Sequence, residues 1–190
     1  HDSLSTLDLS TNTALTKLFC TYNKLTSLNV RNNTALCTLS CNDNKLTSLD
    51  VSNCPNLETL ECSKNPIKTL TIGSNSSLKK IYTHTTNITS IDVTNVPNLE
   101  LLECGVNDIT DLNVTKNSFL KSLWCSGTQL STLDVSYNLT LEELEIVPSY
   151  RKVIIENLKV EDYIEGPIID ELNKLGEMWV FGKDIKGREV

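Results

Sequence analysis

The sequence repeats itself every 21 residues, and this period constrains the fold more than any other feature. The stretch "NKLTSLN" at residues 23–29 returns as "NKLTSLD" at residues 44–50. One column of apolar residues recurs at this step without a gap: Leu18, Leu39, Leu60, Ile81, Leu102, Leu123 and Leu144. A fixed period of this length is typical of solenoids, in which each unit is one coil that buries its apolar side only against its neighbours.

Each unit contains two similar halves. Residues 15–23 ("LTKLFCTYN") and 25–33 ("LTSLNVRNN") share the pattern L-x-x-L-x-[CV]-x-x-N. Alternate residues of an extended chain face the same way, so each half predicts a short strand with its leucine and cysteine or valine turned inward. We expect the asparagine to make the turn that follows and to bond backbone groups that the strands leave unpaired. The pattern predicts a mainly β repeat solenoid of about seven coils with parallel strands.

The first half of the unit resembles the leucine-rich repeat family, whose signature is L-x-x-L-x-L-x-x-[NC]-x-L. Residues 15–25 ("LTKLFCTYNKL"), 36–46 ("LCTLSCNDNKL") and 99–109 ("LELLECGVNDI") match it at nearly every fixed position. The nested 21-residue form is similar to a bacterial class of secreted and cell-surface proteins, and the resemblance covers about residues 4–146. It implies binding by an exposed sheet, usually of proteins and sometimes of glycans, and it implies no common reaction.

The repeat lapses at residues 147–150 ("VPSY"), where it meets a segment of different composition. We therefore expect a solenoid over residues 1–147 and a C-terminal α/β capping segment over residues 148–190. Within the latter, residues 152–160 and 178–181 predict strands and residues 166–176 a short helix that begins at Pro167 and ends at Gly176. A stack needs its last coil covered. The N-terminal end has no such segment, so we expect a processed or trimmed chain.

Composition narrows the classes of partner. The net charge of -7 argues against nucleic acid, whose phosphates require a basic face. No run of about 18 apolar residues is present, so this segment does not insert into a membrane. We expect a monomer that is secreted or displayed on a bacterial surface, with its signal outside this chain.

The cysteines predict core packing rather than chemistry. Five occupy the inward column where related repeats carry leucine: Cys20, Cys41, Cys62, Cys104 and Cys125. Stacked neighbours in such a column have parallel side chains, which suits a disulfide poorly, and no histidine joins them to bind a metal. We expect no metal site and no cofactor. Cys37 and Cys54 lie off the column, and Cys37 is the thiol most exposed to reagents, with Cys54 as the second candidate.

Catalysis is disfavoured by the same geometry. His84 lies one residue beyond the inward column and should face outward, whereas Cys62 and Cys104 face the core, so they cannot form a nucleophile–base pair. The sequence has no Gly-rich phosphate loop and no H-E-x-x-H motif. A regular open sheet should also lack a concave pocket that could tune two carboxylates. We expect a protein that is not an enzyme, with a hydrolase as the weakest alternative.

Charged residues follow a longer rhythm of 42 residues. One column alternates in sign: Glu58, Lys79, Glu100, Lys121 and Glu142. Another separates each aspartate from the next by a neutral residue: Asp8, Asn29, Asp50, Thr71, Asp92, Asn113 and Asp134. Residues of one column in adjacent coils lie a single strand spacing apart. When their charges alternate in sign, neighbouring residues attract each other instead of repelling. The alternative for the aspartate column is a ladder of cation sites.

One outward column carries the candidate binding site. Beside the cysteines it contains Phe19, Ser40, Glu61, Tyr82, Glu103, Trp124 and Glu145. Exposed aromatic residues are enriched where proteins bind partners, and here they coincide with departures from the repeat. The predicted ligand-binding residues are Phe19, Glu61, Tyr82, His84, Glu103 and Trp124. Two structural alternatives stay open: ordinary sheet aromatics, or a C-terminal segment folded over Trp124.

The sequence thus predicts a non-catalytic binding scaffold. Its expected partner is a protein, with a glycan stacked on Tyr82 and Trp124 as the second choice. The rival interpretation is a structural spacer within a larger surface protein.

Overall fold

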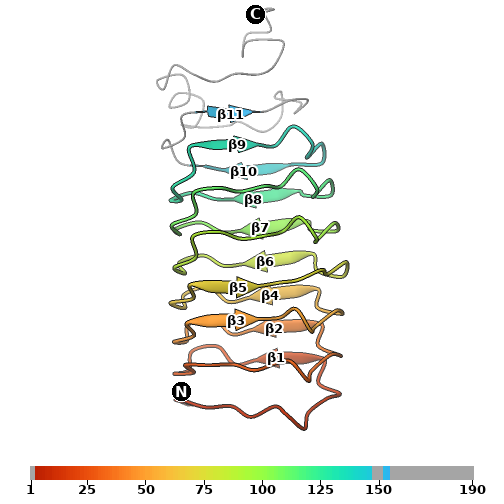
Figure 1. Ribbon diagram of the computed structural model, residues 1–190, viewed down its shortest axis with the longest axis vertical. Helices are drawn as coiled ribbons and strands as arrows, with labels where there is room; N and C mark the ends of the chain where they lie inside the picture. Colours follow the sequence, from red (N-terminus) through yellow and green to blue (C-terminus); the bar gives the residue numbers. More distant parts are fainter. Residues whose placement is uncertain (1–2, 147–151, 155–190) are drawn as a thin grey trace, which may run out of the picture.

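The computed structural model describes residues 3–146 and 152–154, which form an elongated stack of coils (Figure 1). One side of the stack is a seven-stranded parallel sheet, here called the main sheet. Its strands, in spatial order, are β1 (Lys17–Phe19), β2 (Thr38–Ser40), β4 (Thr59–Glu61), β6 (Lys80–Tyr82), β7 (Leu101–Glu103), β8 (Ser122–Trp124) and β10 (Glu143–Glu145). Each strand pairs with the next in a register shifted by one repeat, so that Leu18 lies opposite Leu39. The predicted β solenoid is confirmed.

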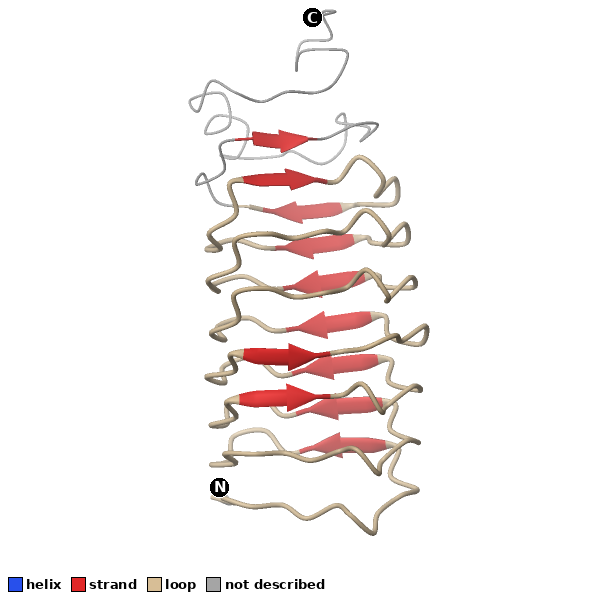
Figure 2. Cartoon of the chain, in the orientation of Figure 1, coloured by secondary structure: helices blue, strands red, loops and turns tan. Residues whose placement is uncertain are grey.

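The second side of the stack is less regular than the sequence predicts. It contains β3 (Ser48–Asp50) paired with β5 (Thr69–Thr71), and β9 (Thr132–Asp134) paired with β11 (Lys152–Ile154). These strands run opposite in direction to the main sheet, on the other side of the core (Figure 2). The equivalent residues 27–29, 90–92 and 111–113 form no strand. The expectation of a strand in every half-repeat is therefore wrong. Backbone bonding is correspondingly weak there, as in the 3.4 Å contact from the Thr110 nitrogen to the Thr89 oxygen.

The strand β11 begins the predicted capping segment and continues the second side of the stack. Lys152 pairs with Thr132, a step of 20 residues instead of 21. The predicted helix over 166–176 and the predicted strand over 178–181 lie outside the described residues. Within the described ranges, no helix is long and apolar enough to cross a membrane.

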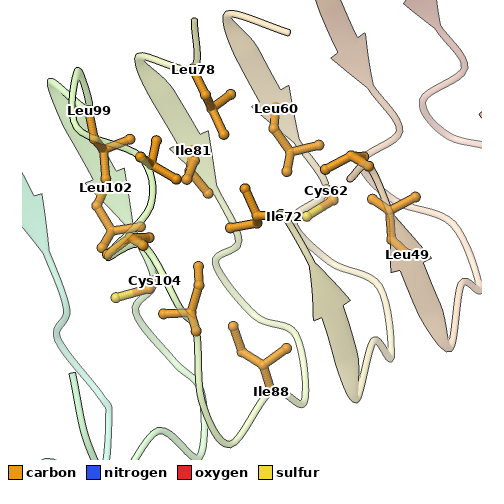
Figure 3. Packing of buried hydrophobic residues seen from close by; sticks show 14 of the residues in the cluster. Leu49, Leu60, Cys62, Ile72, Leu78, Ile81, Ile88, Leu99, Leu102 and Cys104 are labelled. Atoms are coloured by element: carbon orange, nitrogen blue, oxygen red, sulfur yellow. The ribbon is translucent and has the colours of Figure 1, made fainter. Parts of the chain in front are cut away.

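Leucine, isoleucine, valine and cysteine fill the space between the two sides (Figure 3). Leu60, Ile81 and Leu102 are fully buried, and Cys62 and Cys104 beside them are equally inaccessible. This burial confirms the predicted cysteine column. It raises the pKa of the Cys62 thiol to about 12, because the core cannot solvate a thiolate. None of the seven cysteines forms a disulfide bond.

The two cysteines outside the column differ from each other. Cys37 is partly exposed, as predicted. Cys54 is fully buried, so the expectation that it is the second accessible thiol is wrong. It occupies the position that asparagine takes at the second turn of other coils, such as Asn33 and Asn117, where the side chain points inward.

Buried asparagines tie each coil to the one before it. The Asn65 amide nitrogen donates to the carbonyl oxygens of Cys41 and Cys62, each at 3.0 Å, and of Ser63 at 3.2 Å. Its Oδ1 atom accepts a hydrogen bond of 3.0 Å from the Leu46 backbone nitrogen. Asn44 makes the same set of contacts one coil earlier. The predicted bonding of unpaired backbone groups by asparagine is confirmed, and we call this column the asparagine ladder.

The turn conformation itself belongs to the residue before each ladder position. These residues have positive φ angles: Tyr22, Asp43, Lys64, Thr85, Val106 and Gly127. Five of these six residues are not glycine, and their backbones adopt the left-handed conformation at φ between 51° and 55°. The expectation that asparagine makes this turn is therefore wrong in detail. The asparagine side chain forms hydrogen bonds to the backbone of the turn, whereas the residue before it adopts the positive φ angle that reverses the chain.

The charged columns behave as stabilising contacts. Lys79 lies 3.5 Å from Glu58, and Lys121 lies 3.1 Å from Glu100, each pair spanning one repeat. In the aspartate column, Asp50 Oδ1 accepts hydrogen bonds from the hydroxyl and the backbone nitrogen of Ser52. These bonds hold the Asp50 pKa below its usual value. The Asp50 carboxylate thus stabilises the turn that follows it. The described residues contain no cluster of three or more His, Cys, Asp or Glu suited to a metal ion.

Candidate functional site

The last residue of each main-sheet strand faces outward, and together these residues form the outer row: Phe19, Ser40, Glu61, Tyr82, Glu103, Trp124 and Glu145. Strand register makes the row continuous. Tyr82 pairs with Glu61 on one side and Glu103 on the other, and Trp124 pairs with Glu103 and Glu145. The structure thus brings together four of the six predicted residues in adjacent positions.

Phe19 stands apart at the N-terminal end of this row. Ser40 separates it from Glu61, and its side chain is 68% exposed. It therefore lies on the predicted face, three strands away from Tyr82.

Glu61 is already engaged within the sheet. Its Oε2 atom accepts hydrogen bonds from Ser40 Oγ at 2.6 Å and from Asn42 Nδ2 at 3.3 Å. This pairing directs the carboxylate toward the N-terminal neighbour. Glu61 consequently contributes to the order of the face and has fewer sites free for a ligand.

Tyr82 is half-buried between two carboxylates. Partial burial, with Glu61 and Glu103 on either side, raises the pKa of its phenol.

A hollow of about 210 Å³ opens beside the outer row, which corrects the expectation of a face without concavity. Its lining consists of His84, Glu103, Gly105, Val106, Trp124, Ser126 and Glu145. Gly105 lines the hollow with its backbone alone, because it has no side chain. A Cβ atom at Gly105 would lie 2.7 Å from the Ser126 carbonyl oxygen, closer than real Cβ contacts, and 3.7 Å from the His84 ring.

His84 lines this hollow from the row next to the outer row. Its Nδ1 atom shares a 2.7 Å hydrogen bond with the Thr85 hydroxyl, and its backbone nitrogen donates to Ser63 Oγ at 3.1 Å. Cys62 and Cys104 lie in the core, so the predicted separation of histidine and thiols is confirmed.

The sequence analysis missed four residues of the hollow: Gly105, Val106, Ser126 and Glu145. A signal for Gly105 was present, since it interrupts a row of larger residues formed by Thr21, Asn42, Ser63, His84 and Ser126. A missing side chain among polar ones marks a local depression.

Comparisons with known proteins agree with this architecture. Residues 34–79 match the family model described as leucine-rich repeats in two copies. A comparison with curated protein sequences finds no match. Among solved structures, the internalin InlF of Listeria monocytogenes strain 4b F2365 is 22% identical with a TM-score of 0.63. The match covers 93% of this chain and 50% of the internalin.

Two further structures have a similar fold. A chain of the TLR13–ssRNA13 complex is 26% identical with a TM-score of 0.60, over 76% of this chain and 25% of that one. A chain of the Drosophila Toll–Spatzle complex is 21% identical with a TM-score of 0.60, over 93% of this chain and 24% of that one. The present chain spans half or less of the length of these three proteins. Residues 34–79 thus carry the leucine-rich repeat signature, and the parallel stack of the described residues has the same fold as the internalin structure.

Proposed function

We propose that this solenoid is a non-catalytic scaffold that binds a protein partner through the outer row of its main sheet. The observation that carries the proposal is the unbroken run from Tyr82 through Glu103 to Trp124, which opens directly into the hollow. Half-exposed aromatic rings beside charged groups are typical of the anchor residues of protein interfaces.

The partner class follows from charge. Leucine-rich repeat proteins of similar fold occur in a complex with Spatzle and in a complex with single-stranded RNA. This chain has a net charge of -7, and its candidate face carries Glu61, Glu103 and Glu145. Phosphates would be repelled there, so a protein is favoured over a nucleic acid. An internalin shares the fold, and this similarity supports the proposal of a role at a bacterial surface or in secretion.

A glycan is the second candidate. Tyr82 and Trp124 are separated by the one strand β7, so their rings stand roughly 10 Å apart along the stack. A short oligosaccharide could stack on both.

The test compares two double variants. Tyr82→Ala with Trp124→Ala removes the two rings of the outer row that flank Glu103, whereas Phe119→Ala with Tyr137→Ala removes two exposed rings that lie outside the main sheet. Proteins retained by the immobilised wild-type chain are identified by mass spectrometry, purified, and titrated against each variant. We expect the first variant to lose about thirtyfold or more in affinity, equivalent to about 2 kcal/mol, and the second to lose little.

Melting temperatures of both variants should remain close to that of the wild type, because the four deleted rings are partly or largely exposed and lie outside the hydrophobic core. A glycan array probed with the same proteins tests the second candidate. Equal affinity of the two double variants for the purified partner moves the site away from this face. If neither assay yields a ligand, the spacer interpretation replaces the scaffold.

A further inference from the structure

The hollow places one indole ring between two carboxylates. Glu103 on β7 and Glu145 on β10 both pair in register with Trp124 on β8. Neighbouring strands of a sheet are about 4.8 Å apart. Both carboxylate side chains and the ring therefore border the same depression, and all three line it.

These two carboxylates differ from the other acidic groups on the main sheet. Glu61 is hydrogen-bonded by Ser40 and Asn42, and Glu143 on β10 is hydrogen-bonded by Ser122. Among the described residues, neither the Glu103 nor the Glu145 carboxylate has a hydrogen bond or an ion pair. Within residues 3–146 and 152–154, the hollow thus carries negative charge without a compensating partner.

A second polar group in the hollow also lacks a partner. Ser126 lines the hollow, and its buried Oγ atom has no hydrogen-bond partner among the described residues. A buried hydroxyl without a partner costs roughly 1–3 kcal/mol, so rotation of the Ser126 side chain toward a donor or an acceptor in the hollow would increase the affinity for a ligand. This observation is independent of the carboxylates and points to a polar occupant.

Charge and shape select the kind of occupant. Pockets for drug-sized molecules measure about 300–1,000 Å³, whereas this hollow of about 210 Å³ suits a single side chain. Two carboxylates favour a cation, and the indole face attracts one through its ring electrons. A guanidinium group fits best, because its planar donors match carboxylates and it stacks on aromatic rings.

We propose that the Glu103–Trp124–Glu145 hollow binds the side chain of an arginine presented by the protein partner. The inference rests on the proposed function for the existence of that partner, but the hollow can be tested alone. The probe is the capped tripeptide acetyl-Gly-Arg-Gly-amide. Its control is the same peptide with citrulline, which is nearly identical in shape and carries no charge.

Binding is followed by two-dimensional NMR of the ¹⁵N-labelled chain at constant ionic strength. The Trp124 indole signal is distinguished from that of Trp179 with a Trp124→Phe variant. We expect the arginine peptide to shift the Trp124 indole and the Gly105 and Ser126 amides in a saturable manner, and the citrulline peptide to leave them in place. Glu103→Gln and Glu145→Gln should each weaken binding about two- to fivefold.

The matched control is Glu142→Gln, which removes the same charge from an exposed position in the same coil. It should bind the arginine peptide like the wild type, and the NMR spectrum of each variant verifies that its fold is retained. Three results would overturn the inference. The first is equal shifts with both peptides, and the second is an equal loss of affinity in all three variants. The third is the absence of any shift up to roughly 50 mM of peptide, which is well above the millimolar dissociation constants of weak ligands. Saturation by Ca²⁺ at lower concentrations would also overturn it, since this would make the hollow a metal site.

The two proposals fail separately. If the tripeptide does not bind but Tyr82→Ala with Trp124→Ala still abolishes partner binding, the face is functional and only the arginine assignment is wrong. If the tripeptide binds but no partner depends on Tyr82 and Trp124, the hollow recognises arginine outside the function proposed above.

Discussion

The Oδ1 atom of Asn107 accepts two hydrogen bonds from Thr86, at 3.0 Å from its backbone nitrogen and at 2.6 Å from its hydroxyl. Thr86 stands where the asparagine ladder would otherwise continue. The Asn107 amide nitrogen also donates to the carbonyl oxygens of Thr83, Cys104 and Gly105. Asn107 therefore joins the coil that carries His84 to the coil that carries Gly105, and both of these residues line the hollow.

Replacing Asn107 with alanine should reduce the free energy of unfolding by about 2–4 kcal/mol, because it leaves several buried donors and acceptors unpaired. Urea unfolding followed by circular dichroism measures the loss. The control is Asn113→Ala, since Asn113 is exposed and bonds only its own turn at Thr115. This control should lose about 1 kcal/mol or less. Similar losses in both variants would contradict the role of the ladder.

Restoring the ladder should stabilise the chain. In Thr86→Asn, the contacts made by Asn65 predict that the new amide reaches the carbonyl oxygens of Cys62, Thr83 and His84. We expect a gain of about 1 kcal/mol in urea unfolding, which is the net value of one or two added hydrogen bonds. Thr89→Asn, at an exposed position outside the ladder, should change little. A loss of stability in Thr86→Asn would show that this coil is built around threonine.

The left-handed position before the ladder should show a preference for glycine. Gly127 has φ +71°, and a Cβ there would lie 3.3 Å from a Val106 methyl group. Gly127→Ala should therefore cost about 1–2 kcal/mol, the penalty of a left-handed conformation for a residue with a side chain. The reciprocal change Lys64→Gly relieves the same strain at φ 54°, and should raise the midpoint of thermal unfolding slightly. If Gly127→Ala leaves the free energy of unfolding unchanged, these left-handed positions are not strained.

Thiol labelling should be restricted to one site in the native protein. Cys37 is partly exposed, and the other six cysteines are buried. Iodoacetamide followed by peptide mass spectrometry should show rapid modification of Cys37 alone, and Cys37→Ser should abolish it. Modification of Cys54 as fast as Cys37 would mean that its turn opens in solution.

Alkaline pH should destabilise the fold through the cysteine column. The Cys20 and Cys62 thiols have pKa values raised to about 11 and about 12 by burial, above the ordinary value of 9.0. The unfolded chain therefore loses these protons first. Stability is fully present below about pH 9 and falls as the pH rises toward 11–12, by up to about 1.4 kcal/mol per pH unit for each thiol.

Urea unfolding at pH 8, 9 and 10 measures this slope. In Cys62→Ala, the stability at pH 8 should be lower, but the decline between pH 9 and 10 should be shallower. An unchanged slope would show that other groups dominate the alkaline transition.

The columns of the fold could be predicted because every coil has the same environment. Leu60, Cys62 and Asn65 recur at a fixed step, and a stack gives one position one set of neighbours. The second side could not be predicted in the same way. Residues 90–92 carry the same pattern as the strand at Ser48–Asp50, yet they form no strand.

The candidate site was predictable only in part. Side chains alternate between the two faces of a strand, and this rule was enough to place Tyr82, Glu103 and Trp124 on one face. The hollow depended on Gly105, because its backbone approaches Ser126 too closely to admit a side chain. A single sequence shows a glycine at this position but not the distance to the next coil.

The alternating charges at Glu58, Lys79, Glu100 and Lys121 also limit how such a chain can change length by duplication or deletion. Loss of the single coil over residues 79–99 would bring Glu58 next to Glu100, two like charges one strand spacing apart. Loss or gain of two coils, 42 residues, leaves every neighbour opposite in sign. The segment that can be duplicated or deleted without placing like charges side by side is therefore a pair of coils, although the structural repeat is a single coil.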